Sequence, residues 1–471
     1  MNTNFGRKLA VASLIASLCA AWSPAASARG HRLETVPELA TSRLIVKYPA
    51  GTTPVTEPTP ISLSQARAIA AKMGISLKHL RRMARGADVY ELSSPVLPAK
   101  MREMALLLMA ADSSIEYAEP DALMLPMAAA NDPLSAEQWN LFEPAGGIRA
   151  EEAWAGSVGS GVVVAVIDTG VLQHADLSAN LLAGRDFISG RPIARDGDGR
   201  DTNAADQGDW YRQGQCLNDL LGRSDSSWHG THVAGTIAAV ANNGLGVTGV
   251  APGAKVLPLR ALGKCGGYTS DIADAIEWAS GGSVPGVPAN LTPARVINVS
   301  LGAQGACSRS YQTAISDARE RGSVVVAAAG NGSTDARGYT PANCQGVIAV
   351  GASDRHGKRA YYSNFGSKVD VMAPGGDMRA AEGNGILSTL NAGTMRPGAD
   401  IYRNYQGTSM AAPHVAGVAA LMLAKNPALT AVQVEALLKL TARPLSGPCK
   451  QGCGAGIVDA AAAVGAAAAA R

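Results

Sequence analysis

Aromatic side chains are scarce in this sequence, where they make up 4% of the 471 residues. Hydrophobic residues as a whole reach 47%, so the chain can still bury a large core. That core must be built mainly from alanine, glycine and valine, which dominate the composition. Such small residues favour helices packed closely on a parallel sheet over a β-sandwich.

Charge of one sign is not in excess either. The formal net charge is +3, with 41 Lys and Arg residues against 38 Asp and Glu residues. A balance this even gives no electrostatic reason to expect nucleic acid or an anionic membrane surface as a partner.

Long uncharged apolar runs are missing except near the two ends of the chain. Near the start, Arg7 and Lys8 precede the apolar run 9–22, and the small residues 26–28 follow it. This is the pattern of a secretory signal, which we predict over residues 1–28. Because the run is short for a membrane anchor, we expect a secreted, soluble protein without an anchor.

The sequence also lacks the spacings that bind zinc, since it has neither an HExxH motif nor paired CxxC motifs. It contains seven cysteines, of which Cys19 lies in the predicted signal. An even remaining set in an exported chain indicates three disulfides, for which 15 pairings are open. These cysteines are Cys216, Cys265, Cys307, Cys344, Cys449 and Cys453.

A serine lies in a setting typical of a nucleophile, in the segment Gly407-Thr-Ser409-Met-Ala-Ala-Pro413. Gly407 allows a tight turn, and residues 410–423 have the alanine-rich character of a buried helix. We place Pro413 in the first turn of that helix, where its missing N–H is not needed. Ser409 is then a candidate both as nucleophile and, through its backbone N–H, as oxyanion donor. The alternative is that this segment only caps a core helix.

Two imidazoles lie three residues apart, at His229 and His232. On a helix they point to neighbouring faces, so only one of them can reach the serine. We assign the general base to His229, beside small Gly230, and a hydrogen-bonded structural role to His232. His414 is assigned a structural role as well.

The apolar run 161–167 ends in Asp168-Thr169-Gly170, which indicates a buried strand followed by a turn. Open α/β sheets carry their chemistry at such strand ends. Asp168 would accept the Nδ1 proton of His229 and fix its tautomer. An aspartic-protease site would need a second Asp-Thr/Ser-Gly triplet, and the sequence has none.

Asn331 follows the apolar run 324–326 and four small residues, so we expect it just past another strand. Its side-chain amide would supply a second oxyanion donor. Together with Asp168, His229 and Ser409, it completes the groups needed to cleave a peptide bond through an acyl-enzyme.

The order Asp168, His229, Asn331, Ser409 resembles that of the subtilisin family of serine endopeptidases. The resemblance covers residues 131–463 and implies a three-layer α/β fold with a mainly parallel sheet; residues 464–471 would be an alanine-rich tail. It implies a monomeric protease of broad specificity, exported through a bacterial periplasm, whose partners are protein or peptide substrates. Two alternatives stay open, a non-catalytic binding protein on the same scaffold and a processing protease with a single target.

The resemblance also implies a cleft in which the substrate adds as an extended strand. Small residues there would let the substrate backbone approach closely. The residues implied are Ser300, Leu301, Gly302, Gly267 and Tyr268 along the cleft, with Ala328 and Gly330 in the pocket for the residue before the cleaved bond. Chain proximity and the resemblance together favour the disulfides Cys216–Cys265, Cys307–Cys344 and Cys449–Cys453.

Residues 29–130 have the pattern of a separate small α+β unit. We predict strands at 43–48, 88–92 and 115–125 and helices at 63–73 and 99–109. The position of this unit resembles that of the subtilase propeptide, which implies an intramolecular inhibitor and folding chaperone in a zymogen that processes itself. The small residues 127–130 favour cleavage near Ala130 or Asn131. A stable accessory domain is the alternative.

From residue 131 onward, predicted strands and helices alternate, which indicates helices covering both faces of a parallel sheet. The strands are predicted at 162–168, 255–260, 296–300, 324–328 and 347–350. The helices are predicted at 232–241, 270–280, 311–321, 410–423 and 432–441.

A glycine-rich loop before His229 concentrates carboxylates. It includes Asp196, Asp198, Arg200, Asp201, Asp206 and Asp209. A hard cation would relieve the repulsion among them, so we predict a structural calcium ion, and no cofactor for catalysis itself. The loop is not an EF-hand, because Asp201 and Gln207 stand where that motif requires glycine and glutamate. A solvated acidic loop is the alternative.

Overall fold

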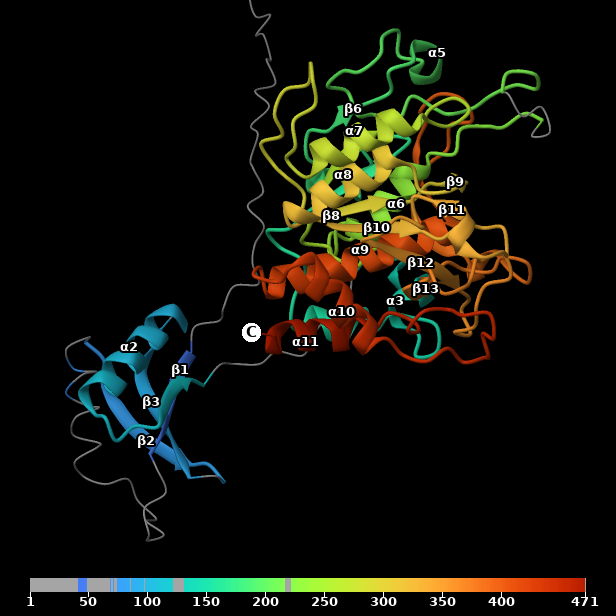
Figure 1. Ribbon diagram of the computed structural model, residues 1–471. Coiled ribbons are helices and arrows are strands. Elements are labelled where there is room, and N and C mark those ends of the chain that lie inside the picture. Colours follow the sequence, from blue (N-terminus) through green and yellow to red (C-terminus); the bar gives the residue numbers. More distant parts are fainter. Residues whose placement is uncertain are drawn as a thin grey trace, which may run out of the picture. The chain divides into compact units, whose positions relative to one another are not determined.

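Figure 1 shows the computed structural model of the chain, in which residues 41–48, most of 74–121, 131–216 and 222–470 are described. The contacts divide the chain into two compact units, one ending at Met127 and the other beginning at Ala128. The predicted signal at 1–28 and the predicted helix at 63–73 lie outside the described residues, apart from isolated positions in the helix.

The first unit has an antiparallel sheet in the order β2-β3-β1-β4 and one described long helix. Its elements are β1 (Thr41–Lys47), β2 (Leu77–Arg82), β3 (Ala87–Val96), α2 (Pro98–Ala111) and β4 (Tyr117–Pro120). Leu44 and Val46 of β1 share a core with Met101 and Met104 of α2. The core therefore lies between one face of the sheet and this helix.

Most of the described elements of this unit match the prediction, but β2 is absent from it and β4 is shorter than the predicted 115–125. The sequence of β2, LKHLRR, does not alternate between apolar and polar residues. Of its two leucines, Leu77 is buried and Leu80 is exposed. Pairing with β3, rather than a hydrophobic pattern, makes this segment a strand.

The second unit alternates strands and helices along the chain. Its strands are β5 (Val163–Asp168), β6 (Arg185–Asp186), β7 (Lys255–Arg260), β8 (Val296–Val299), β9 (Ala303–Gln304), β10 (Val324–Ala328), β11 (Tyr339–Thr340), β12 (Val347–Ser353), β13 (Val371–Pro374), β14 (Ile386–Asn391) and β15 (Asp400–Tyr405). Its helices are α3 (Trp139–Phe142), α4 (Ala150–Trp154), α5 (Arg191–Ala194), α6 (His229–Ala238), α7 (Thr269–Ala279), α8 (Arg309–Glu320), α9 (Thr408–Lys425), α10 (Ala431–Thr441) and α11 (Ala460–Ala469).

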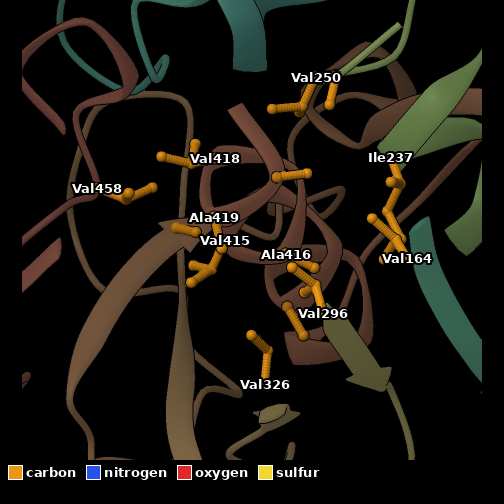
Figure 2. Close-up of a cluster of buried hydrophobic side chains, with 14 of the residues drawn as sticks. Val164, Ile237, Val250, Val296, Val326, Val415, Ala416, Val418, Ala419 and Val458 are labelled. Carbon is orange, nitrogen blue, oxygen red and sulfur yellow. The ribbon is translucent and has the colours of Figure 1, made fainter. Parts of the chain in front are cut away.

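Seven of these strands form a parallel sheet in the order β13-β12-β10-β8-β5-β7-β6. Consecutive residues of its strands point into two separate cores. On β5, Val164 lies in a core with α6 and α9, whereas Ile167 lies in a core with α7 and α8. Figure 2 shows the first core, in which Val326 of β10 and Ala416 of α9 are among the labelled side chains. The predicted three-layer fold with a parallel sheet is confirmed.

The start of α9 differs from the prediction. The helix begins at Thr408, so Pro413 is its sixth residue and lies in the second turn instead of the first. Proline is unfavourable there because it cannot donate to the carbonyl four residues earlier, which is that of Ser409. The structure supplies another donor to this carbonyl, described below.

The alanine-rich C-terminal segment forms the helix α11. The boundary predicted after residue 463 falls inside α11, where Ala463, Val464 and Ala467 are buried in the core shared with α9. Alanine has the highest helix propensity, and its small side chain lets α11 pack closely on α4 and α9. Among the described residues, no helix is both long enough and apolar enough to cross a bilayer.

Candidate active site

Asp168 is the last residue of β5, and its side chain is fully buried. Its Oδ1 accepts a hydrogen bond from the N–H of Thr169 at 2.8 Å and lies 2.8 Å from Nδ1 of His229. An ionised carboxylate can only accept, so this contact assigns the proton of the neutral imidazole to Nδ1. The Nε2 atom of His229 is then the nitrogen that can take up a proton.

His229 is the first residue of α6, and 22% of its side chain is exposed. The start of α6 lies directly against the turn that follows β5. A Cβ atom on Gly230 would lie 2.2 Å from the carbonyl oxygen of Gly170, so only glycine fits at that position. This close approach brings the imidazole to the end of the strand that carries Asp168.

The pKa of His229 is raised from its ordinary value of 6.5. Burial by itself lowers this pKa, but the charge of Asp168 and its hydrogen bond act in the opposite direction and are reinforced by other carboxylates. Those further carboxylates are Asp209 and Asp206 of the acidic loop. The protonated imidazole, which forms when a base accepts a proton, is therefore stabilised here.

His232 and His414 are fully buried and have structural contacts. Nε2 of His232 lies 2.9 Å from the carbonyl oxygen of Ile386, and Nδ1 of His414 lies 2.8 Å from that of Met410. Burial lowers the pKa of His232 to about 3 and that of His414 to about 4. Both rings are therefore neutral at physiological pH, which is consistent with a structural role in the core.

Ser409 is the second residue of α9 and is half-buried. Because Pro413 has no N–H, the carbonyl oxygen of Ser409 lacks its usual helical donor. The hydroxyl of Ser300, a buried residue just after β8, donates to this oxygen at 2.9 Å. The backbone of the candidate nucleophile is thereby tied to the sheet.

Asn331 lies shortly after β10, and its Oδ1 accepts two hydrogen bonds from Thr408. The backbone N–H and the hydroxyl of Thr408 each lie 2.9 Å from this oxygen. Because a backbone N–H can only donate, the amide must present its oxygen to Thr408, which leaves the Nδ2 hydrogens to donate elsewhere. The Thr408 hydroxyl also accepts from the N–H of Gly330 at 3.1 Å. The residue next to Ser409 thus orients the candidate oxyanion donor.

These groups come from the C-terminal ends of β5 and β10 and from the N-termini of α6 and α9. The two helices pack against each other and share the core on one face of the sheet. In an open parallel sheet, the C-terminal strand ends are where a ligand can approach several elements at once. An alcohol, an imidazole, a carboxylate and an amide are therefore carried by neighbouring elements.

The predicted cleft segments lie after β8 and before α7. Leu301 is half-buried and Gly302 is exposed, while Gly267 and Tyr268 are exposed beside the first residue of α7. Tyr268 has 58% of its surface exposed, so its ring is free to contact a bound chain. Of these segments, only Ser300 has its side chain directed to Ser409, through the hydrogen bond to the carbonyl.

Ala328 and Gly330, predicted to line the specificity pocket, occupy the end of β10 and the turn after it. Gly330 has a φ of +101°, and a Cβ there would lie 2.4 Å from Nδ2 of Asn364. A larger residue would therefore strain the backbone and collide with a buried side chain. Glycine is therefore required in the turn that leads from β10 to Asn331.

The acidic loop does not gather its carboxylates around one point. Asp196 binds the guanidinium of Arg260, which is fully buried at the end of β7. Arg200 of the same loop pairs with Asp271 and Asp274, at 2.7 Å each. Arginine side chains thus supply positive charge where the prediction placed a cation.

Three further loop carboxylates have hydrogen-bond donors of their own. Asp201 accepts from Asn203, Asp206 from Thr169 and Asp209 from Ser227. Within the described residues, no group of three or more His, Cys, Asp or Glu side chains is placed to hold a metal ion. The residues predicted as calcium ligands therefore do not fit one ion in this arrangement.

The three disulfides have the pairing that the resemblance implies. Sulfur–sulfur distances are 2.00 Å for Cys216–Cys265, 1.95 Å for Cys307–Cys344 and 2.06 Å for Cys449–Cys453. The first of these bonds joins the end of the acidic loop region to the segment before Gly267.

Sequence reasoning missed the two threonines that hold the site. Thr408 orients Asn331, and Thr169 receives the N–H of Gly230 at 3.0 Å. Each directly neighbours a candidate catalytic residue in the chain, and this adjacency is the only sequence signal. Ser300 holds the carbonyl of Ser409, and the only sequence signal for this role is Pro413. Because Pro413 has no N–H, that carbonyl needs another donor.

Comparison with known proteins decides the family, because residues 159–456 match the model described as the subtilase family. The chain belongs to the subtilase family. This subtilase is accordingly a serine-type endopeptidase. An extracellular protease of Xanthomonas campestris pv. campestris is 51% identical over 431 residues, covering 90% of this chain and 73% of that protein. An extracellular basic protease of Dichelobacter nodosus is 42% identical over 469 residues, covering 97% of this chain and 75% of that protein.

A solved structure supports the same fold. A protease from Pseudoalteromonas arctica is 56% identical and superposes with a TM-score of 0.71, covering 72% of this subtilase and 100% of that chain. The subtilisin-like fold expected from the motif order is therefore confirmed.

Proposed function

We propose that this subtilase cleaves peptide bonds of proteins with Ser409 as nucleophile, through an acyl-enzyme. Nε2 of His229 takes the proton of the Ser409 hydroxyl as it attacks and returns it to the leaving amine. Asp168 keeps the second proton on Nδ1 and stabilises the imidazolium. The observation that carries this proposal is the 2.8 Å hydrogen bond between buried Asp168 and His229.

The oxyanion of the tetrahedral intermediate is held by the Nδ2 group of Asn331 and the backbone N–H of Ser409. The N–H lies in the first turn of α9, where backbone donors lack intrahelical acceptors and the helix dipole favours negative charge. Thr408 fixes the amide before the substrate binds. Donors already oriented in this way need no reorganisation during the reaction, which is why they stabilise its transition state.

Secretion in zymogen form is the second part of the proposal. The relatives in Xanthomonas campestris and Dichelobacter nodosus are named as extracellular proteases. Residues 1–28 would direct export, and residues 29–130 would assist folding and inhibit the enzyme until it cleaves itself near Ala130 or Asn131. The separate core of the first unit supports a propeptide that folds as its own body. The mature enzyme would act as a monomer.

We further propose broad specificity with a preference for apolar or bulky residues before the cleaved bond. Ala328 and Gly330 are small residues at the predicted pocket, and Tyr268 is exposed at the cleft segment before α7. Profiling with a mixed-peptide library tests this point. Cleavage restricted to a single sequence motif would favour a dedicated processing protease instead.

The test of the function is the secretion of the full chain and of its Ser409→Ala variant. The unsubstituted chain should yield a shortened, active species whose N-terminus lies near Asn131. The variant should remain unprocessed and lose activity by about a million-fold, the loss known for subtilisin, the family's namesake. Peptide hydrolysis by the variant at the native rate would show that another group is the nucleophile.

A further inference from the structure

Two carboxylates of the acidic loop hold the chain on both sides of His229. Asp209 accepts from the N–H of Ser227 at 2.6 Å and from the Ser227 hydroxyl at 2.8 Å. That hydroxyl also receives the backbone N–H of His229, at 3.3 Å. One carboxylate therefore accepts from both hydrogen-bond donors of Ser227, the residue two positions before the candidate base.

The second carboxylate acts from the other side, through Thr169. Asp206 is 1% exposed, and its Oδ2 accepts from the Thr169 hydroxyl at 2.6 Å. The same hydroxyl accepts from the N–H of Gly230 at 3.0 Å. Gly230, Thr169 and Asp206 thus form a directed chain of hydrogen bonds that ends on a buried acceptor.

The turn between these two contacts is strained. Trp228, directly before His229, has a φ of +47°, in the left-handed region that a bulky side chain rarely adopts. Such a conformation persists only when its surroundings hold it in place. The indole N–H donates to the carbonyl of Gly393 at 2.6 Å, and the Tyr405 hydroxyl donates to the carbonyl of Ser227 at 3.0 Å. Together with the hydrogen bonds of Asp209, these contacts fix the turn that orients the His229 side chain.

We propose that Asp209 is a positioning residue for His229, with Asp206 supporting it through Thr169. The inference rests on the proposed role of His229 as general base. It gives the acidic loop a function that does not need a metal ion. Neither carboxylate touches the substrate; each acts through the backbone that carries the imidazole.

The charge of Asp209 also reaches the imidazole. Three carboxylates act on His229 or on one another, namely Asp168 from β5 and Asp206 and Asp209 from the loop. The other groups that face His229 or these carboxylates are His232 from α6, Tyr405 from β15, and the cations Arg195 and Arg260. Asp209 raises the pKa of His229. Removing its charge should therefore lower that pKa and move the acid limb of kcat/KM to lower pH.

The test compares Asp209→Asn with Asp225→Asn in the secreted full chain. Asp225 is exposed and stands two residues before Ser227, so its variant removes the same charge nearby without loosening the turn. Active-site titration with a serine-directed phosphonate gives the concentration of competent sites. For Asp209→Asn we expect kcat per labelled site to fall about ten- to a hundred-fold, because the base is misplaced, and the acid limb to move to lower pH. Asp225→Asn should match the unsubstituted enzyme.

An acid limb and a kcat per labelled site equal to those of Asp225→Asn would overturn the proposal. If Asp209→Asn lowers the melting temperature but changes neither kcat per labelled site nor the acid limb, Asp209 has only a structural role and the proposal is likewise overturned. If the unsubstituted enzyme is not labelled at Ser409, the proposed function fails first, which separates the two claims.

A second variant serves if Asp209→Asn is not secreted. Ser227→Ala keeps the charge of Asp209 but removes the hydroxyl that links it to His229. We expect kcat per labelled site to fall about tenfold with an unmoved acid limb. A native kcat in this variant would equally overturn the proposal.

Discussion

The hydroxyl of Ser300 donates a 2.9 Å hydrogen bond to the carbonyl oxygen of Ser409, between the end of β8 and the start of α9. It replaces the helical bond that Pro413 cannot form. The backbone of the nucleophile is thus held by the sheet, and the position of its hydroxyl does not depend on the first turns of α9 alone.

Ser300→Ala should leave this carbonyl without its donor. An unpaired buried acceptor costs about 1–3 kcal/mol, so the melting temperature should fall. Pro413→Ala restores a backbone N–H four residues after Ser409, and the double variant should recover part of the loss. Melting temperatures would be measured in a Ser409→Ala background, where self-digestion cannot interfere. If the change in melting temperature of the double variant equals the sum of the changes in the two single variants, this explanation is contradicted.

Asn331→Ala should lower kcat by about a hundred- to a thousand-fold, with little change in KM, because the amide acts only on the developing oxyanion. That range is the one known for subtilisin itself. Thr408→Val should give a smaller loss, since it removes the hydroxyl that orients the amide, whereas Thr408→Ser keeps that hydroxyl and serves as the control. Steady-state kinetics on a peptide substrate measure all three, and a loss confined to KM would argue against the assigned role.

Acid should destabilise the folded enzyme through its buried histidines. In the unfolded chain both rings bind protons near pH 6.5, but in the folded protein His232 does so only near pH 3 and His414 near pH 4. The stability they contribute is therefore present above pH 6.5 and is lost as the pH falls toward 4. The melting temperature of the Ser409→Ala form should drop over this range. With His414→Gln added, the melting temperature should fall less steeply with falling pH than with the exposed-site control His356→Gln. Parallel curves for the two variants would refute the assignment.

The calcium prediction from the sequence can be tested at the loop itself. Asp198→Asn removes an exposed loop carboxylate that belongs to the predicted ligand set. Because the neighbouring carboxylates already have arginine or hydroxyl partners, we expect this variant and the unsubstituted enzyme to be inactivated by heat at the same rate, with or without EDTA. If EDTA shortens the lifetime of the unsubstituted enzyme but not that of the variant, the loop binds calcium after all.

The sequence points to candidate reactive groups more readily than to the residues that support them. Asp168, His229, Asn331 and Ser409 stand out because their motifs combine a reactive group with small neighbours and a strand or helix end. Ser300 and Thr169 could not be recognised in the same way, because each acts on a partner far along the chain. Hydroxyl groups are common in proteins, and only the folded structure shows which of them form a hydrogen bond with a backbone N–H or carbonyl that has no other partner.

The same reason limits what the sequence shows of the acidic loop and of the C-terminal segment. The pairing of Asp196 with Arg260 could not be recognised from the sequence, because Arg260 lies at the end of another strand. Most of the alanine-rich segment predicted as a tail at 464–471 belongs to α11, whose burial depends on contacts with distant helices. The fold class and the positions of the main strands were accessible because buried parallel strands are continuous apolar runs, such as 324–328.

The most direct measurement is the mapping of a serine-directed phosphonate on the secreted enzyme by intact mass and peptide mass analysis. One adduct per molecule is expected, attached to Ser409, and His229→Ala should abolish its formation because the hydroxyl loses its base. An adduct on any other serine, or full labelling without His229, would contradict the assignment of Asp168, His229 and Ser409 to one catalytic group.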